Sequence, residues 1–499
     1  MLKKVRIALA AVFFLCITGL FLDFTGTMAD CFGWMAKLQF LPAVLGLSIV
    51  PVLIVLLLTL VMGRIYCSVI CPMGVFQDVV AWISRIFKKK NPYSYSKPKT
   101  WLRLAVLAAF VVLLVAGFNG IALLVAPYSA YGRIVNSLLQ PLYIMGNNAL
   151  AGVAASNGSY DIYAVDPHLM VTPLLIVAAV SLVVVVVCAA IGGRTYCNTI
   201  CPVGTVLGYI AKFSWFKPYI DADKCKACGK CAKNCKASAI LIDKKNGIAA
   251  IDYTRCVTCG NCLEECAFGS LTYCHPAPAK TKQEEKVDTS RRNMLTTAVV
   301  LGTSAVVKAQ EMKLDGGYAT IEDKVMPKRQ TKIVPPGALS ASNLAKHCTG
   351  CQLCVSNCPN NVLRPSTSLD SFLQPFSSFE NGYCRPECTK CSEVCPAGAI
   401  KPITREEKSS IQTGHAVVVL ANCIAVTDER TCGNCERHCP TGAIQMVVKN
   451  KEDEGKRNAV KIPVVDEERC IGCGACENLC PSRPLSAIYV EGHEVHKTI

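Results

Sequence analysis

The sequence lacks the motifs that hold several common redox cofactors. It has only seven histidines in 499 residues, and no Cys-x-x-Cys-His occurs, which excludes covalently attached c-type haem. No histidine lies within its four long apolar runs, which argues against a haem b held by two histidines. No Gly-x-Gly-x-x-Gly follows a strand pattern, so nothing supports a bound NAD or flavin.

Cysteine, in contrast, is abundant. The chain has 32 cysteines, and 24 of them fall into six motifs of four. Four motifs have the spacing Cys-x2-Cys-x2-Cys-x3-Cys, which is typical of bacterial ferredoxins: three thiolates bind one [4Fe–4S] cluster and the fourth binds its neighbour. These regular motifs are Cys225/Cys228/Cys231/Cys235, Cys256/Cys259/Cys262/Cys266, Cys348/Cys351/Cys354/Cys358 and Cys470/Cys473/Cys476/Cys480.

The other two motifs are stretched. They are Cys384-x3-Cys388-x2-Cys391-x3-Cys395 and Cys423-x8-Cys432-x2-Cys435-x3-Cys439. In four of the six motifs a proline follows the last cysteine, where it fits the first turn of a helix. Zinc sites pair two Cys-x2-Cys units, and disulfide frameworks belong to short secreted chains, so both fit this pattern less well. The sequence therefore predicts six [4Fe–4S] clusters and one-electron transfer.

Four apolar runs are almost free of charge. They are Val5–Leu22, Leu41–Val61, Leu104–Ala126 and Met170–Ile191, at 18, 21, 23 and 22 residues. Each is about long enough to cross a hydrocarbon core of ~30 Å. The mean hydropathy of +0.35 is high for a soluble protein. We therefore expect four transmembrane helices.

The basic residues indicate how these helices are oriented. Lys3 and Lys4 precede the first run, Arg6 lies at its start, and eight basic residues lie between the second and third runs, whereas the two alternate loops hold only Lys37 and Arg133. Lysine and arginine favour the cytoplasmic side, so residues 216–280 are expected there, at the inner membrane of a bacterium. The net charge of +16 is concentrated at membrane edges and among cysteines. Clusters with four thiolates would offset most of it, so nucleic acid is not an expected partner.

A second export signal is predicted in mid-chain. Ser290-Arg291-Arg292-Asn293-Met294-Leu295 opens the apolar run Met294–Val307, and Val307-x-Ala309 resembles a cleavage site. This is similar to a twin-arginine signal, which exports proteins already folded around a cofactor. Residues 311–499 would then be periplasmic. Two alternatives remain open. The segment could be a buried helix that follows Arg-Arg by chance, or it could stay uncleaved as a fifth membrane anchor.

An eleven-residue motif occurs twice, 130 residues apart. Arg64-Ile-Tyr-Cys67-Ser-Val-Ile-Cys71-Pro-Met-Gly74 follows the second run, and Arg194-Thr-Tyr-Cys197-Asn-Thr-Ile-Cys201-Pro-Val-Gly204 follows the fourth. The membrane domain therefore reads as a tandem repeat of a two-helix unit. Its four thiols could bind a cluster or another metal, act as redox thiols, or only pack. The single cysteines Cys16, Cys31, Cys188 and Cys274 receive no role.

At this point the chain resembles known families. Residues 1–280 resemble NapH-type membrane ferredoxin proteins, which share the Cys-x3-Cys-Pro motif with NosR and CcoG. Residues 290–499 resemble the exported four-cluster ferredoxins of the NapG/MauM type. One departure from the pattern is that Lys236 and Ala267 stand where a proline usually follows the fourth cysteine.

The resemblance implies a fusion that relays electrons from menaquinol or ubiquinol to a periplasmic reductase or cytochrome, for example a periplasmic nitrate reductase. Whether the chain is itself a quinol dehydrogenase component stays open. Asp78 and the pair Tyr66/Tyr196 are weak candidates for a quinol site, and packing or surface roles fit them better. The alternative functions are metal handling or oxidase maturation through the membrane cysteines, suggested by CcoG, and a scaffold without redox chemistry of its own.

The predicted architecture is an α-helical membrane domain plus α+β ferredoxin-like domains. The expected domains are 1–215 (four transmembrane helices), 216–280 (cytoplasmic, two clusters), 281–310 (linker with the signal or a fifth anchor) and 311–499 (periplasmic, four clusters). The apolar stretches 239–243 and 248–252 flank an Asn-Gly turn and predict a hairpin.

The expected ligand sets are crossed between motifs. In the first ferredoxin, Cys266 should join Cys225/Cys228/Cys231, and Cys235 should join Cys256/Cys259/Cys262. In the exported part we expect like motifs to pair. The two regular motifs would exchange their fourth cysteines, so that Cys480 completes the set 348–354 and Cys358 completes the set 470–476. The two stretched motifs would do the same, Cys439 with 384–391 and Cys395 with 423–435, and would form a unit nested inside the first. The alternative is sequential pairing of first with second and third with fourth.

Overall fold

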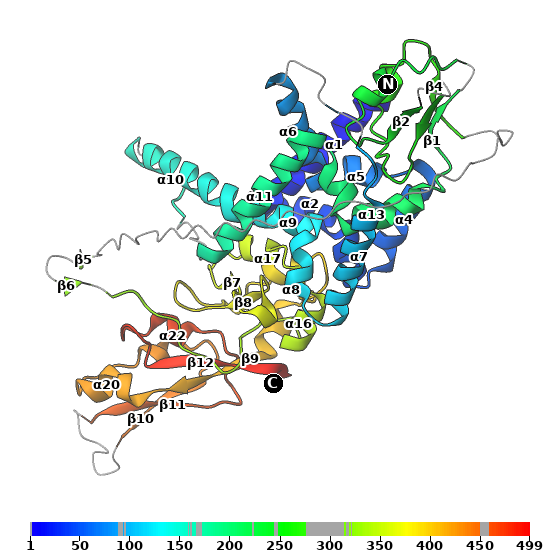
Figure 1. The fold of residues 1–499 in the computed structure, drawn as a ribbon. Coiled ribbons are helices and arrows are strands. Elements are labelled where there is room, and N and C mark those ends of the chain that lie inside the picture. Colours follow the sequence, from blue (N-terminus) through cyan, green and yellow to red (C-terminus); the bar gives the residue numbers. More distant parts are fainter. Residues whose placement is uncertain are drawn as a thin grey trace, which may run out of the picture.

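A computed structural model describes residues 2–87, 93, 96–157, 159, 162–165, 172–221, 224–243, 248–275, 314–315, 319–320, 322–449 and 459–499. The predicted linker and export signal at 281–310 lie outside these residues. Figure 1 shows three parts in a row: a small ferredoxin part (residues 217–275), a bundle of helices, and a larger ferredoxin part (residues 322–499) at the opposite end.

The bundle is built from residues 2–211. Its helices are α1 (Leu2–Leu22), α2 (Thr27–Lys37), α3 (Phe40–Leu45), α4 (Ile49–Met62), α5 (Ile65–Val69), α6 (Pro72–Phe87), α7 (Thr100–Val115), α8 (Asn119–Ala122), η1 (Leu123–Val125), α9 (Pro127–Ile134), η2 (Val135–Leu139), α10 (Gln140–Ser156), α11 (Thr172–Gly192), α12 (Thr195–Thr199) and α13 (Pro202–Ala211).

Two of the four predicted spans are single helices, and two are interrupted. Among the described residues, only α1 and α11 are long and apolar enough to cross a membrane. The second run is divided into α3 and α4, and the third into α7, α8 and η1. Four continuous transmembrane helices are therefore not confirmed.

Both interruptions lie where the larger ferredoxin part packs against the bundle. A Cβ atom on Gly46 would lie 2.3 Å from the carbonyl oxygen of Ala397, and one on Gly120 would lie 2.4 Å from that of Phe372. A backbone approach this close requires glycine. The apolar runs are therefore interrupted where the larger ferredoxin part packs closely against the bundle. The hydrophobicity of the sequence alone does not reveal these positions.

The bundle exposes a large apolar surface. Side chains such as Leu57, Val112 and Ile191 are 57%, 64% and 69% exposed on separate helices. Apolar side chains exposed on several helices suit an apolar environment around the bundle. One hydrophobic core nevertheless continues from the bundle into both ferredoxin parts.

The small ferredoxin part contains the predicted hairpin. Strand β2 (Ile240–Asp243) pairs antiparallel with β3 (Ile248–Ile251), which confirms that prediction; the turn itself lies outside the described residues. Strand β1 (Lys217–Ile220) pairs with β4 (Leu271–Cys274), and the short helices α14 (Lys230–Lys233) and α15 (Asn261–Glu264) carry cysteines.

The larger ferredoxin part folds as two consecutive halves. Its strands are β7 (Leu363–Pro365), β8 (Pro375–Ser377), β9 (Ile411–Val418), β10 (Ile444–Val448), β11 (Lys461–Val465) and β12 (Ile488–Thr498), paired β7–β8, β9–β12 and β10–β11. Its helices are α16 (Ala341–His347), α17 (Leu353–Ser356), η3 (Leu369–Ser371), α18 (Lys390–Glu393), α19 (Arg405–Ser410), η4 (Leu420–Asn422), α20 (Ile424–Thr427), α21 (Asn434–Arg437) and α22 (Ala475–Leu479). The two-residue strands β5 (Leu314–Asp315) and β6 (Ala319–Thr320) pair before it.

Candidate metal centres

The regular motifs share one backbone conformation. In each, the residues just before and just after the second cysteine have positive φ, as at Ala227 (46°) and Gly229 (78°). The same pattern occurs at Thr258/Gly260, Gly350/Gln352 and Gly472/Gly474. Left-handed residues turn successive N–H groups toward one point and create a concave anion-binding loop. These loops therefore suit a cluster whose sulfurs carry negative charge.

Backbone amides also reach the thiols directly. Gly350 N–H donates to Cys348 Sγ at 3.4 Å, Ala239 N–H to Cys235 Sγ at 3.3 Å, and Ala487 N–H to Cys480 Sγ at 3.3 Å. Such hydrogen bonds favour thiolates and are among the factors that set the potentials of iron–sulfur clusters.

The small ferredoxin part brings its cysteines together across the two motifs. One cavity is lined by Cys225, Cys228, Cys231 and Cys266, and another by Cys235, Cys256, Cys259 and Cys262. This is the crossed arrangement expected from the spacing. Ligation itself stays a prediction.

The nested arrangement predicted for the larger part is wrong. Cys395 interacts electrostatically with Cys351 and Cys354, and Cys358 interacts with Cys384. A cavity farther along is lined by Cys439 with Cys470, Cys473 and Cys476, and the next by Cys480 with Cys423, Cys432 and Cys435. Pairing is therefore sequential.

The nested prediction failed because the cysteine spacing within a motif determines the shape of its own loop. It carries no information about which other motif that loop packs against. Each half of the larger part is a compact unit made from consecutive motifs, so each combines one regular and one stretched loop. The halves meet where Cys384 N–H donates to the carbonyl of Cys473 at 2.9 Å. This contact joins the thiol group that contains Cys384 in the first half to the thiol group that contains Cys473 in the second half.

Two lysines support these loops, the half-buried Lys324 and the buried Lys408, and no sequence pattern pointed to either. Lys324 Nζ donates to the carbonyls of Glu477, Asn478 and Cys480 at 2.6, 2.7 and 2.9 Å. Burial lowers its pKa to about 8. Burial would also lower the pKa of Lys408, but the neighbouring thiolates, Cys384 first, outweigh it and raise that pKa above its ordinary value.

The duplicated motif brings four thiols together inside the bundle. Cys67, Cys71, Cys197 and Cys201 are 4%, 3%, 2% and 3% exposed. Cys71 interacts electrostatically with Cys67 and Cys197, and Cys201 interacts with the other three. Gln77 Nε2 donates to Cys197 Sγ at 3.1 Å, and Gly204 N–H donates to Cys201 Sγ at 3.2 Å. We call these four cysteines the bundle thiols.

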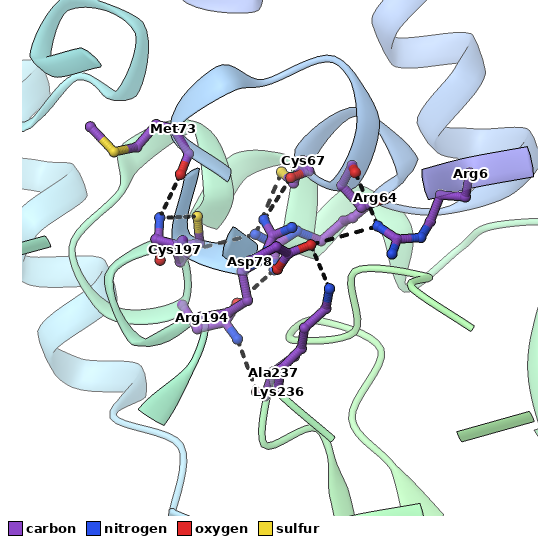
Figure 2. Close-up of polar contacts among 12 residues, drawn as sticks. Arg6, Arg64, Cys67, Met73, Asp78, Arg194, Cys197, Lys236 and Ala237 are labelled. Carbon is purple, nitrogen blue, oxygen red and sulfur yellow. Dashed lines mark hydrogen bonds and ion pairs between the residues drawn. The ribbon is translucent and has the colours of Figure 1, made fainter. Parts of the chain in front are cut away.

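The two copies of the motif hold each other. Figure 2 shows Arg194 reaching the first copy, where its Nη1 donates to the carbonyl of Cys67 at 2.6 Å. Arg64 reaches the second copy, where it donates to the carbonyl of Cys197 at 3.5 Å. Glycines 74 and 204 make room, since a Cβ on either would lie 2.1 or 2.3 Å from those carbonyl oxygens. The repeated Arg…Gly frame was visible in the sequence, but its reciprocal contacts were not.

The donor set at the bundle consists of four buried thiols, the ligand type of iron–sulfur clusters. Among the described residues, no three Cys, His, Asp or Glu side chains are arranged to hold one metal ion. All 32 cysteines are free thiols, so no disulfide consumes them. A cubane spreads its four thiolates around four irons, which needs a wider arrangement than a zinc site. The buried guanidinium groups of Arg64 and Arg194 would balance thiolate charge at the bundle thiols.

The weak quinol candidates have structural partners. Asp78 pairs with Arg194 at 2.7 Å, Lys236 at 2.5 Å and Arg6 at 3.6 Å (Figure 2). Burial would raise the pKa of Asp78, but Arg194 and Lys236 outweigh it and hold that pKa well below its ordinary value. This carboxylate is therefore a poor proton acceptor. Both tyrosines have hydrogen-bond partners, since Tyr66 OH donates to Gln39 and Tyr196 OH to the carbonyl of Val125.

Models of protein families match most of these motifs. One described as "4Fe-4S binding domain" matches residues 44–90 and 174–220, which contain the bundle thiols. Models described as "4Fe-4S dicluster domain" match 217–267, 383–443 and 430–483. A further dicluster match, 252–362, joins two motifs that the structure holds at opposite ends of the bundle.

Several curated proteins are similar to a third of the chain. The methylamine utilization ferredoxin-type protein MauM of Methylobacillus flagellatus is 30% identical over 173 residues, 33% of this chain and 70% of MauM. Ferredoxin-type protein NapG of Escherichia coli is 31% identical over 33% of this chain and 75% of its own length. Ferredoxin-type protein NapF of the same organism is 27% identical over 36% of this chain and all of NapF. No solved structure matches significantly.

Proposed function

The chain belongs to the family of ferredoxin-type proteins that includes MauM and NapG, and we propose that it relays electrons across a membrane, from the quinol pool to a periplasmic reductase or cytochrome. It is an iron–sulfur protein with several [4Fe–4S] sites. The finer proposal is that the helical bundle is a NapH/NosR-like membrane domain fused to an exported four-cluster ferredoxin.

One observation carries this proposal: groups of four thiols follow one another from one end of the molecule to the other. Near the small ferredoxin part, Arg64 interacts with Cys256 and donates to Cys67 Sγ at 3.8 Å. On the far side of the bundle thiols, Cys201 interacts with Tyr196, and Arg133 interacts with both Tyr196 and Cys351. A one-electron carrier needs its centres to follow one another in such a series.

The bundle thiols are the proposed middle centre of this series. A cluster there would supply a one-electron carrier between the two ferredoxin parts. The protein's own contribution is to exclude water, to fix the sulfurs, and to balance their charge with Arg64 and Arg194. Two of the cysteines lie within the short helices α5 and α12, and the other two directly precede α6 and α13. The alternative of metal handling needs thiols that a partner can reach, and side chains 2–4% exposed do not offer that.

The proposed topology places residues 216–280 in the cytoplasm and 311–499 in the periplasm. Its support is the distribution of basic residues and the position of the two ferredoxin parts at opposite ends of the bundle (Figure 1). Reporters fused after His275 and after Glu322 test it. The first should be active only in the cytoplasm and the second only in the periplasm. Cytoplasmic activity at both positions would refute a relay between two sides.

The electron donor is tested with purified full-length protein. A reduced short-chain quinol should bleach the visible absorbance of the clusters under anaerobic conditions. The matched control is the Cys67→Ser/Cys197→Ser variant, in which reduction of the clusters beyond the bundle should slow strongly. If quinol reduces no cluster in the unmodified protein, the quinol assignment is wrong. The iron–sulfur relay itself is tested separately, by the reporter fusions and by the Cys67→Ser/Cys197→Ser variant.

A further inference from the structure

Arg133 is a fully buried arginine without an ion pair among the described residues. It lies on α9 and is 1% exposed. Its Nη1 and Nη2 donate to the carbonyls of Leu123 and Leu124 at 3.3 and 3.1 Å, and its Nε has no partner. Burying a charge is strongly destabilising when attraction to other groups does not offset the loss of hydration. The burial of the Arg133 guanidinium therefore calls for a functional explanation.

The surroundings of Arg133 contain sulfur rather than carboxylate. Its electrostatic neighbours are Tyr196 and Cys351. Tyr196 in turn interacts with Cys201 and Cys197, two of the bundle thiols. The guanidinium thus lies between the middle centre and the first thiol group of the larger ferredoxin part.

Helix α9 is pressed against the loop that carries Cys351. A Cβ on Gly132 would lie 2.4 Å from the carbonyl oxygen of Cys351. Ser129 Oγ donates to the carbonyl of Thr349 at 2.6 Å, and Asn136 Nδ2 donates to Gln352 Oε1 at 3.0 Å. These contacts fix the position of the charge relative to the loop, so its effect on a cluster there would not be averaged by motion.

We propose that Arg133 is a positioning residue that raises the reduction potential of the cluster held by Cys348, Cys351, Cys354 and Cys395. The inference rests on the proposed relay. The transfer that it assists moves one electron: the centre at the bundle thiols is oxidised by one electron and the cluster at Cys351 is reduced by one, with no proton and no bond change. The accepting cluster becomes one unit more negative, and a fixed positive charge in a water-poor site stabilises that state.

The experiment is a redox titration of the full-length protein in nanodiscs, with chemical mediators and electron paramagnetic resonance detection. Arg133→Met and Arg133→Gln remove the charge, and glutamine keeps a donor for the carbonyls. Each should lower the potential of one cluster by about 59 mV or more, a tenfold change for a one-electron couple. The Cys351→Ser variant identifies that signal, because it alters the same cluster.

Two controls separate charge from packing. Arg133→Lys keeps the charge and should shift the potential by less than half as much. Tyr128 also interacts with Cys351 and Cys395, but its hydroxyl has no hydrogen-bond partner in the part of the chain that the structure describes. Tyr128→Phe should therefore leave the potential unchanged.

Equal shifts in the lysine and methionine variants, or no shift in either neutral variant, would overturn the proposal. So would loss of the clusters in both neutral variants, because Arg133 would then be needed for folding alone. Mediators replace quinol in this titration, so a failed quinol assignment does not affect its result.

Discussion

The two ends of the helical bundle hold their ferredoxin parts by different means. The end next to residues 217–275 is charged: Asp78 bridges Arg194 and Lys236, and Arg64 and Arg103 donate to the carbonyl of Thr254. The end next to residues 322–499 is held by neutral donors. There Ser129, Asn136 and Asn119 donate to the segment 345–352. Gly132 admits the backbone of the same segment at Cys351, and two further glycines, Gly120 and Gly46, admit the backbone at Phe372 and Ala397.

The stability of the two interfaces therefore depends on different properties. Buried ion pairs respond to pH and to loss of one partner, whereas close backbone packing responds to added volume. The packed end is also the end at which Arg133 keeps its charge uncompensated by any described carboxylate. Carboxylates there would cancel the effect that we assign to it.

The largest expected effect concerns the cluster that borders the packed end. Cys395→Ser should remove or convert the same cluster that Cys351→Ser affects, because Cys395 lies with Cys351 and Cys354. Cys480→Ser should alter a different, distal cluster, because Cys480 lies with Cys423, Cys432 and Cys435. Iron content and paramagnetic signals measure both. A shared signal for Cys480→Ser and Cys351→Ser would restore the nested arrangement.

At the charged end, Asp78→Asn should lower the free energy of unfolding by about 3–5 kcal/mol, since it leaves Arg194 and Lys236 without their anion. Denaturant-induced loss of cluster absorbance measures it. The folded pKa of Asp78 is depressed, so its contribution is complete above the ordinary value of 3.8 and disappears as pH falls below it. Asp78→Asn should lack this acid-dependent step. An identical acid profile in both proteins would show that the pair contributes nothing.

At the packed end, Gly132→Val should cost about 1–3 kcal/mol by overpacking. The site of damage should be the loop around Cys351, detected as faster proteolysis of residues 345–357. Gly146→Val is the matched control, since among the described residues no atom beyond its chain neighbours and its own helix backbone lies within 4 Å of a Cβ at that position. Similar proteolysis in both variants would mean that the close approach is not needed for docking.

The smallest effects are expected for exposed ion pairs, one at each end. Lys3 pairs with Glu264 at the charged end, and Lys390 pairs with Asp30 at the packed end. Solvent screens both, so Lys3→Met and Lys390→Met should leave stability unchanged within measurement error, at low and high salt. A clear loss in Lys390→Met would mean that charge also holds the packed end, against the distinction drawn above. A clear loss in Lys3→Met would mean that exposed ion pairs, and not only buried ones, hold the charged end.

Local features were predictable from the sequence, but relations between distant segments were not. The regular motifs, the 240–251 hairpin and the duplicated Arg…Gly frame follow from spacing and turn chemistry. The interruptions at Gly46 and Gly120 exist because residues 372 and 397 pack there, which no local pattern encodes. Pairing of the stretched motifs failed for the same reason. Arg133 counted in the sequence only as one of two basic residues in the alternate loops, since its burial depends on packing between helices and loop.

The burial of the bundle thiols has a consequence for biogenesis. Cys67, Cys71, Cys197 and Cys201 are at most 4% exposed in the part of the chain that the structure describes, so a finished bundle keeps them from a scaffold that delivers iron and sulfide. A cluster at these thiols must be inserted while the second copy is still apart from the first. Maturation would thus have a fixed order, in which cofactor insertion precedes closure of the helices.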